Sequence, residues 1–263
     1  MRRLAAPAVG LNIVLALALL LASAVPARAW SPEMHQHVAE QAGRLMPVSL
    51  QHVLAQNLSR LREGAVAPLS QQDFAHLRAG QDGRRGSLEQ VMVSQVQRVL
   101  DLLAQRAPMN TVMYEMGVLS HYVTLANDPT IADNADPREA DWADDFERYT
   151  EARMNSFRMV FDGYYSPSLA KDDVPGFVGE CKRRAGRHYP VLSMMWVKGD
   201  GSIARGDFDD RHPVYGVAAL TTAHAIGDTA KLWIYIWLRS NGDTTSLPFP
   251  QGLQVGPAVG GEP

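Results

Sequence analysis

TVMYEMGVLSHYVTLANDP, residues 111–129, is the stretch that decides the fold class. Its apolar residues recur at spacings of three and four, which predicts an α-helix over about 111–126. Val, Ile and Thr do not alternate with polar residues over any useful length of the chain, so no sheet is expected. We therefore predict an all-α fold, a single-domain multi-helix bundle. His121 interrupts the apolar run and is either a core residue with satisfied nitrogens or a ligand.

Helical patterns continue on both sides of this stretch. Ser31 and Pro32 form a helix start, an N-cap followed by a first-turn proline. A capping box, SLEQ at 87–90, opens another helix. The other helices are predicted at about 32–46, 49–64, 87–107, 136–162 and 213–238, with shorter ones near 175 and 191–197.

The first 29 residues have the pattern of a secretory signal peptide. Arg2 and Arg3 give a positive start, 11–25 is nearly all apolar, and Ala27 and Ala29 are small residues of the kind a signal peptidase reads. The apolar run is shorter than the roughly 20 residues that a spanning helix needs. We expect an exported protein, periplasmic or extracellular, with no transmembrane segment after signal removal. Its working domain would span 30–240, and the Gly- and Pro-rich segment 241–263 would be a flexible tail.

Charge and cysteine content narrow the function classes. The signal holds three of the 25 Lys and Arg residues, and 28 acidic residues remain, so the mature formal charge is about −6 and nucleic acid is not an expected partner. With Cys181 as its single cysteine, the chain cannot form an internal disulfide. Packing, bound metal or both must stabilise the domain.

Cleavage after Ala29 would give the new N-terminus a metal-binding character. The α-amine of Trp30 would titrate near about 7.7, so much of it is neutral at neutral pH. Its nitrogen and the Trp30 carbonyl oxygen can chelate a metal, and His35, five residues on, can turn its ring toward them. His37 lies about 200° round the same helix, so it cannot share that site. The alternative is that either histidine is an ordinary surface residue.

Three other features have two interpretations each. His224 and Asp228 share a helix face, either as a metal-binding or second-shell pair or as a satisfied half-buried pair. The basic run at 182–187 is expected to be a solvated helix face, although anionic lipid headgroups could bind there. Cys181, beside that run, is expected to be unreactive because no sequence-adjacent His or Asn supports catalysis.

Two segments resemble the zinc-dependent phospholipase C family and the related single-strand nucleases. The mature start WSPEMH (30–35) looks like the family's N-terminus, where a terminal Trp and a nearby His hold one zinc of a trinuclear cluster. His121-Tyr122 and Pro129 fall in register with the family's central helix, and AKLW (230–233) resembles its last helix. The resemblance covers roughly 30–238 and implies a helical bundle of the phospholipase C type.

The resemblance also implies a set of metal ligands, but it is incomplete. The matched positions are Trp30, His35, His76, His121 and Glu147. Positions where the family has further ligands are apolar here: Leu69, Leu125, Ile131 and Ala143. Leu125 replaces a bridging carboxylate that would offset the repulsion between neighbouring dications. Nearby acids that could substitute are Asp73, Asp128, Asp133 and Asp144; alternatively they are ordinary loop and cap charges. We expect one to three zinc ions, fewer than a full cluster.

Two functions remain open at this stage. The resemblance implies an exported metal-dependent phosphodiester hydrolase of the phospholipase C type, which binds a phospholipid headgroup through a reduced metal site. The alternative is a non-catalytic exported binding protein on the same scaffold with a degenerate metal site. A plain helical protein without metal is a third hypothesis.

Overall fold

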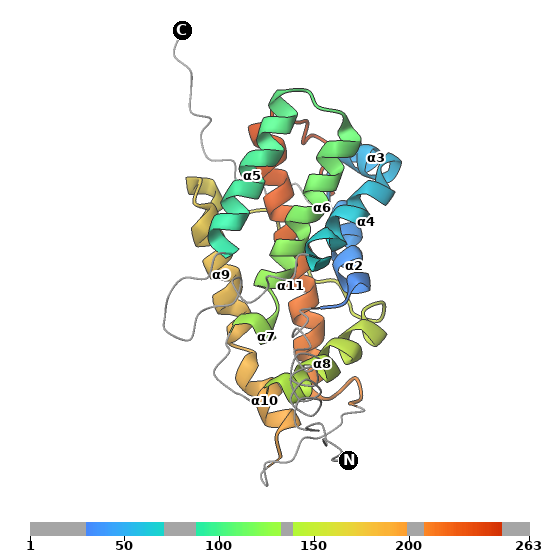
Figure 1. Cartoon of the computed structure of the whole chain (residues 1–263), viewed down its shortest axis with the longest axis vertical. Coiled ribbons are helices and arrows are strands. Elements are labelled where there is room, and N and C mark those ends of the chain that lie inside the picture. The colour runs from blue at the N-terminus through green and yellow to red at the C-terminus, as the bar shows by residue number, and fades with distance from the viewer. Residues whose placement is uncertain (1–29, 71–87, 133–138, 199–207, 249–263) are drawn as a thin grey trace, which may run out of the picture.

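The computed structural model describes residues 30–70, 88–132, 139–198 and 208–248 (Figure 1). The described residues form helices and no β-strand, so the all-α prediction is confirmed for this part of the chain. The α-helices are α2 (Pro32–Gly43), α3 (Val48–Gln56), α4 (Leu58–Val66), α5 (Leu88–Ala104), α6 (Met109–Ala126), α7 (Pro129–Ala132), α8 (Glu139–Arg153), α9 (Val174–Gly186), α10 (Tyr189–Trp196) and α11 (Pro213–Arg239). Short 3₁₀ helices lie at Ala67–Ser70 and Leu169–Lys171. None of the described helices is both long and apolar enough to cross a membrane.

Some helix ends follow local sequence signals, and others do not. Ser31 caps α2, because its hydroxyl accepts a hydrogen bond from the Met34 amide at 3.2 Å. The predicted helix 49–64 is instead two helices, α3 and α4, because Asn57 leaves the helical conformation (φ −119°, ψ 23°). The predicted helix 136–162 ends at Arg153, whose carbonyl accepts hydrogen bonds from both the amide and the hydroxyl of Ser156.

Helix α6 is the centre of the bundle, and it packs most tightly against α4. All of its residues from Glu115 to Ala126 are buried. Gly64 on α4 and Gly117 on α6 face each other at the crossing: a Cβ on Gly64 would clash with the Tyr114 carbonyl, and one on Gly117 would lie 2.8 Å from the Ala65 amide nitrogen. The two glycines therefore allow the backbones of α4 and α6 to meet.

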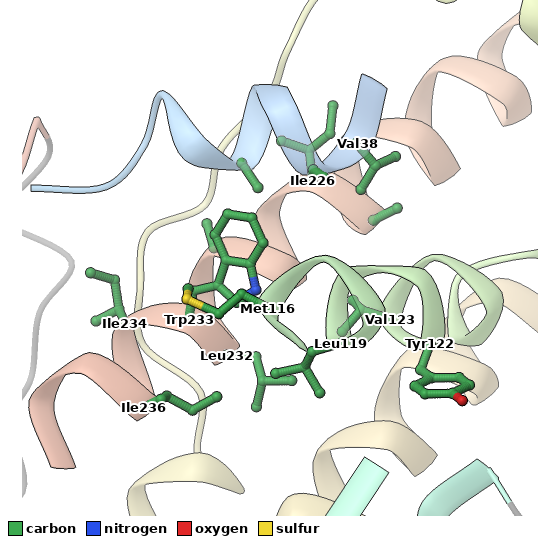
Figure 2. Packing of buried hydrophobic residues seen from close by; sticks show 14 of the residues in the cluster. Val38, Met116, Leu119, Tyr122, Val123, Ile226, Leu232, Trp233, Ile234 and Ile236 are labelled. Atoms are coloured by element: carbon green, nitrogen blue, oxygen red, sulfur yellow. The ribbon is translucent and has the colours of Figure 1, made fainter. Parts of the chain in front are cut away.

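Two hydrophobic cores share α11. The main core lies between α2, α4, α5, α6, α9 and the C-terminal half of α11; Figure 2 shows Val38, Leu119 and Trp233 in it. The second core joins α8, α10 and the N-terminal half of α11, around Trp142 and Trp196, whose rings stack at 5.7 Å between centroids. The 27-residue helix α11 is thus the element that connects the two ends of the molecule.

The first residues of the predicted tail contact the main core. Leu247 is buried, and the Val48 amide donates a hydrogen bond to the Ser246 hydroxyl at 3.0 Å. The predicted end of the domain at residue 240 stays a prediction, as does the signal peptide, because residues 249–263 and 1–29 lie outside the described residues.

Candidate metal centre

Two histidines from different helices meet in the interior. His35 on α2 and His121 on α6 are both fully buried, and their rings stack with centroids 3.9 Å apart and planes 19° apart. Both residues were predicted as ligands from the sequence, and the structure brings them together.

A main-chain carbonyl holds the ring of His121. Nδ1 of His121 lies 2.9 Å from the Ala65 carbonyl oxygen, an approach that the Gly64–Gly117 crossing one turn away permits. Because a carbonyl only accepts, Nδ1 carries the hydrogen, and in the neutral ring Nε2 then carries the lone pair. Burial lowers the pKa of His121 to about 4, although its hydrogen bond to Ala65 opposes this, so the ring is neutral at pH 7. A backbone-anchored, neutral imidazole is the usual form of a histidine metal ligand.

The ring of His35 has no such hydrogen bond within the described residues. Both of its ring nitrogens are buried and have no hydrogen-bond partner within the described part of the chain. Burial, and then the neighbouring His121, hold the pKa of His35 well below its ordinary value. A buried polar atom without a partner costs about 1–3 kcal/mol, so this ring needs a partner that the described residues do not supply.

Trp30 lies at the start of the same helix. Its indole is 2% exposed and belongs to the main core, although its Nε1 has no hydrogen-bond partner among the described residues. It directly precedes the α2 cap Ser31, so the buried indole fixes this end of α2 against the bundle. A mature chain that begins at Trp30 would have its amine at this fixed position.

The described residues hold too few neighbouring ligand side chains for a multinuclear cluster. Zinc bonds an imidazole nitrogen at about 2 Å in the ring plane, and two nearly parallel stacked rings cannot both point at one ion, so one ring must turn before both can bind. No group of three or more His, Cys, Asp or Glu side chains in the described ranges could hold a metal. Leu125 and Ala143, at two of the family's ligand positions, are buried apolar residues. Of the predicted ligands that the structure describes, it brings His35 and His121 into contact.

The remaining predicted ligands lie elsewhere or outside the described residues. Asp128 is buried, and its Oδ1 accepts hydrogen bonds from the amide (2.8 Å) and hydroxyl (2.7 Å) of Thr130 at the start of α7. Glu147 is half-buried on α8 and Asp144 is exposed there. His76, Asp73 and Asp133 lie outside the described residues, so their role as ligands stays a prediction.

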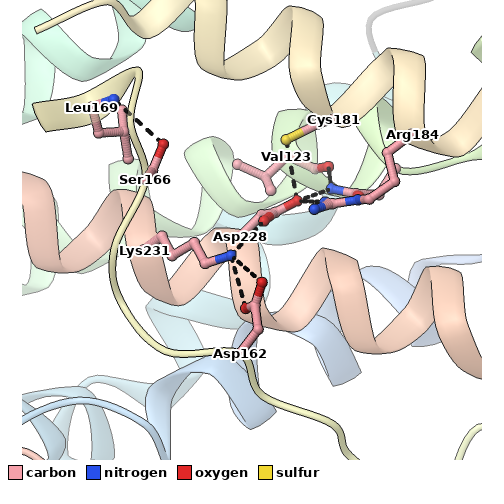
Figure 3. Close-up of polar contacts among 9 residues, drawn as sticks. Val123, Asp162, Ser166, Leu169, Cys181, Arg184, Asp228 and Lys231 are labelled. Carbon is pink, nitrogen blue, oxygen red and sulfur yellow. Dashed lines mark hydrogen bonds and ion pairs between the residues drawn. The ribbon is translucent and has the colours of Figure 1, made fainter. Parts of the chain in front are cut away.

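A buried ionic cluster, which the sequence did not predict as a unit, ties α6, α9 and α11 together (Figure 3). Its centre is Asp228, whose side chain is 3% exposed and pairs with Arg184 and, at 3.5 Å, with Lys231. Asn127 donates to the same carboxylate at 3.1 Å, and Lys231 also pairs with Asp162 at 2.8 Å. The spacing of Asp228 and Lys231 by three residues was the sequence signal for this cluster.

The cluster changes the interpretation of the basic run at 182–187. Arg183 and Arg187 are exposed as expected, but Lys182 pairs with Glu89 at 3.0 Å and Arg184 pairs with Asp228. Cys181 is buried and donates to Asp228 at 3.1 Å. Burial, followed by the Asp228 charge, raises the pKa of the thiol well above its ordinary value, which makes it a poor nucleophile.

Comparison with known proteins relates the chain to others through its fold alone. No protein-family model matches the sequence, and no curated protein matches it. Among solved structures, the fold resembles a crystal structure of Clostridium perfringens alpha-toxin isolated from avian strain SWCP, with a TM-score of 0.58 and 16% sequence identity. The match covers 84% of this chain and 66% of that one, so this chain spans a little under two thirds of its neighbour's length. The predicted all-α bundle is thereby confirmed, and its fold resembles that of alpha-toxin.

Proposed function

We propose that this chain is an exported protein that binds a single metal ion, zinc by preference, on a phospholipase C-like scaffold. The ligands would be His35, His121 and the terminal amine and carbonyl of Trp30. The ion would be held between α2 and α6 and would not form part of a hydrolytic cluster.

The observation that carries this proposal is the buried His35 ring, whose two nitrogens have no hydrogen-bond partner within the described residues. A neutral imidazole offers a lone pair that zinc accepts, and its stacked neighbour His121 has its Nδ1 already bonded to a backbone carbonyl. A cation bound here would satisfy His35 and explain why two histidines are buried where apolar side chains would otherwise pack.

Export is part of the proposal because the site needs a free amine. The signal pattern at 1–29 ends one residue before Trp30, and the indole of Trp30 is already packed in the core. Signal cleavage would therefore create a metal ligand at a position that the fold holds fixed.

A metal-dependent hydrolase of phospholipids is the second candidate. The scaffold and the anchored His121 favour it. It needs further ligands, which His76, Asp73 and Asp133 could supply from segments outside the described residues, together with Glu147, Asp128 or Asp144. In that case bound metals would lower the pKa of a water molecule and polarise the phosphodiester of a phospholipid headgroup.

Metal analysis and an activity assay separate the two candidates. The exported protein is purified without chelator, its zinc content is measured, and hydrolysis of phosphatidylcholine is followed with added zinc. One zinc per chain without turnover supports the single-ion protein, whereas two or more zinc ions with turnover support the hydrolase. A preparation that binds no metal would rule out both.

Variants identify the ligands. His35→Gln and His121→Gln should each lower the zinc affinity by at least about tenfold, since each removes one bond to the ion. His52→Gln is the matched control, because His52 is exposed on α3 and bonds only to Gln56 among the described residues. One Ala added before Trp30 should weaken zinc binding, since it moves the amine; unchanged affinity would refute the role of the terminus.

A further inference from the structure

A pocket lies beside α2, on the opposite side of that helix from His35. It has a volume of about 270 Å³ and is formed by the C-terminal half of α2, the segment 154–159 that follows α8, and the middle of α11. His37 and Gln41 line it from α2, two and six residues beyond His35. Because positions two apart on a helix face about 200° away from each other, this pocket is separate from the proposed metal centre.

The lining of this pocket is basic and rich in hydrogen-bond donors. Arg44, at the end of α2, and Arg158 both line it, together with His37, Gln41 and Asn155. None of the described residues that line it is acidic. Such a set of guanidinium, imidazole and amide groups matches the oxygens of a phosphate, which guanidinium groups can bind through paired hydrogen bonds.

Neither arginine is neutralised by an ion pair within the part of the chain that the structure describes. Arg44 and Arg158 are exposed, and no side chain within the described ranges forms an ion pair with either. The acid nearest to Arg44 in sequence, Glu40, is held by Arg62 at 2.6 Å. Two positive charges that share a hollow without a counter-ion repel each other, and an anion between them removes that repulsion.

Apolar residues give the pocket its floor and one side of its rim. Ala223 and Ile226 of α11 are buried, and Met159 lines the pocket although it is 40% exposed. The next residue, Val160, is 66% exposed. The volume is near the lower limit for small-molecule sites, so the pocket is the size for a small phosphate-bearing group rather than for a large ligand.

We propose that this pocket binds a phosphate group through Arg44 and Arg158. The group would belong either to a small soluble phosphomonoester or to the headgroup of an anionic phospholipid, with Met159 and Val160 contacting the acyl region in the second case. This site is independent of the proposed metal ion, and it persists in protein that has been stripped of metal.

Binding is measured by calorimetry on EDTA-treated protein with two soluble probes, inorganic phosphate and glycerol 3-phosphate. In parallel, co-sedimentation is measured with vesicles of phosphatidylcholine alone and of phosphatidylcholine mixed with phosphatidylglycerol. Arg44→Gln and Arg158→Gln should each weaken binding by at least about tenfold, and the double variant should abolish it. The matched control is Arg183→Gln, which removes an equal charge from an exposed position on α9.

The source of the phosphate follows from which probe binds. Saturable binding of a soluble probe that depends on Arg44 and Arg158 supports a soluble ligand. Binding only to vesicles with phosphatidylglycerol, with the same dependence, supports a lipid headgroup. The proposal is overturned if no probe binds, or if Arg183→Gln weakens binding as much as the pocket variants do, because general electrostatic attraction would then account for it. Melting curves of the variants verify that each remains folded.

Discussion

The close approach of the α4 and α6 backbones makes Gly117 an informative position for a stability test. Adding one methyl group in Gly117→Ala would place a Cβ 2.8 Å from the Ala65 amide nitrogen and closer still to the Leu61 carbonyl oxygen. Both neighbours are backbone atoms of α4, which cannot move aside as a flexible side chain does. The methyl group therefore has to push α4 and α6 apart.

The net effect is the difference of two terms. Overpacking costs about 1–3 kcal/mol and occasionally more, and the rigid neighbours put this site at the upper end. Replacing a helical glycine by alanine gains up to about 1 kcal/mol. We expect Gly117→Ala to lower the free energy of unfolding by about 2 kcal/mol or more. Zinc affinity should fall as well, because the carbonyl of Ala65 that anchors His121 belongs to the displaced helix.

Gly216→Ala is the matched control. Gly216 lies on α11, and a Cβ there would meet no atom within 4 Å, so the same substitution should be neutral or stabilising by up to about 1 kcal/mol. Urea unfolding followed by circular dichroism gives both free energies. If Gly117→Ala were as stable as Gly216→Ala, the contact between α4 and α6 would be wrong as described.

Three further predictions concern buried groups. Asp228→Asn should lower the free energy of unfolding in urea by about 3 kcal/mol, because it removes the buried carboxylate that pairs with Lys231 and Arg184. The control Asp172→Asn, which breaks an exposed pair with Arg239, should lower it by at most about 1 kcal/mol. Equal losses of stability in the two variants would contradict the buried cluster. In EDTA, the free energy of unfolding should fall as the pH drops from about 6.5 towards about 4, because His35 and His121 bind protons in the unfolded chain but stay neutral in the folded one. A free energy of unfolding that does not change over this pH range would contradict the burial of both rings in the neutral form. A thiol reagent should label Cys181 only after denaturation, and rapid labelling of the native protein would show that the thiol is accessible.

The sequence predicted which segments are helical better than it predicted the residues at which the helices break. The cap at Ser31 and the apolar run of α6 are local signals, and both predicted helices are present. The break at Asn57 was missed because an apolar spacing of three and four continues through it, while the residue itself bonds back to Val53. Local patterns describe what each segment favours, and such a break depends on packing against neighbouring helices.

The candidate site was predictable in its residues but not in its geometry. The spacing from Trp30 to His35 and the isolated His121 singled out two side chains that the structure places in contact, while their role as ligands stays a prediction. Their stacking depends on how closely α4 and α6 approach at Gly64 and Gly117, which no local pattern encodes. The cluster around Asp228 was missed for the same reason, since its members come from three helices.

The central claim is that an exported chain beginning at Trp30 holds one metal ion through its own amine and two buried imidazoles. Native mass spectrometry of the protein recovered from the cell exterior or periplasm tests the start of the chain and the metal count together. We predict a species whose mass equals residues 30–263 plus one zinc ion, and whose zinc is lost in His35→Gln. A chain that begins at another residue, or one that carries no metal or several ions, would contradict the claim.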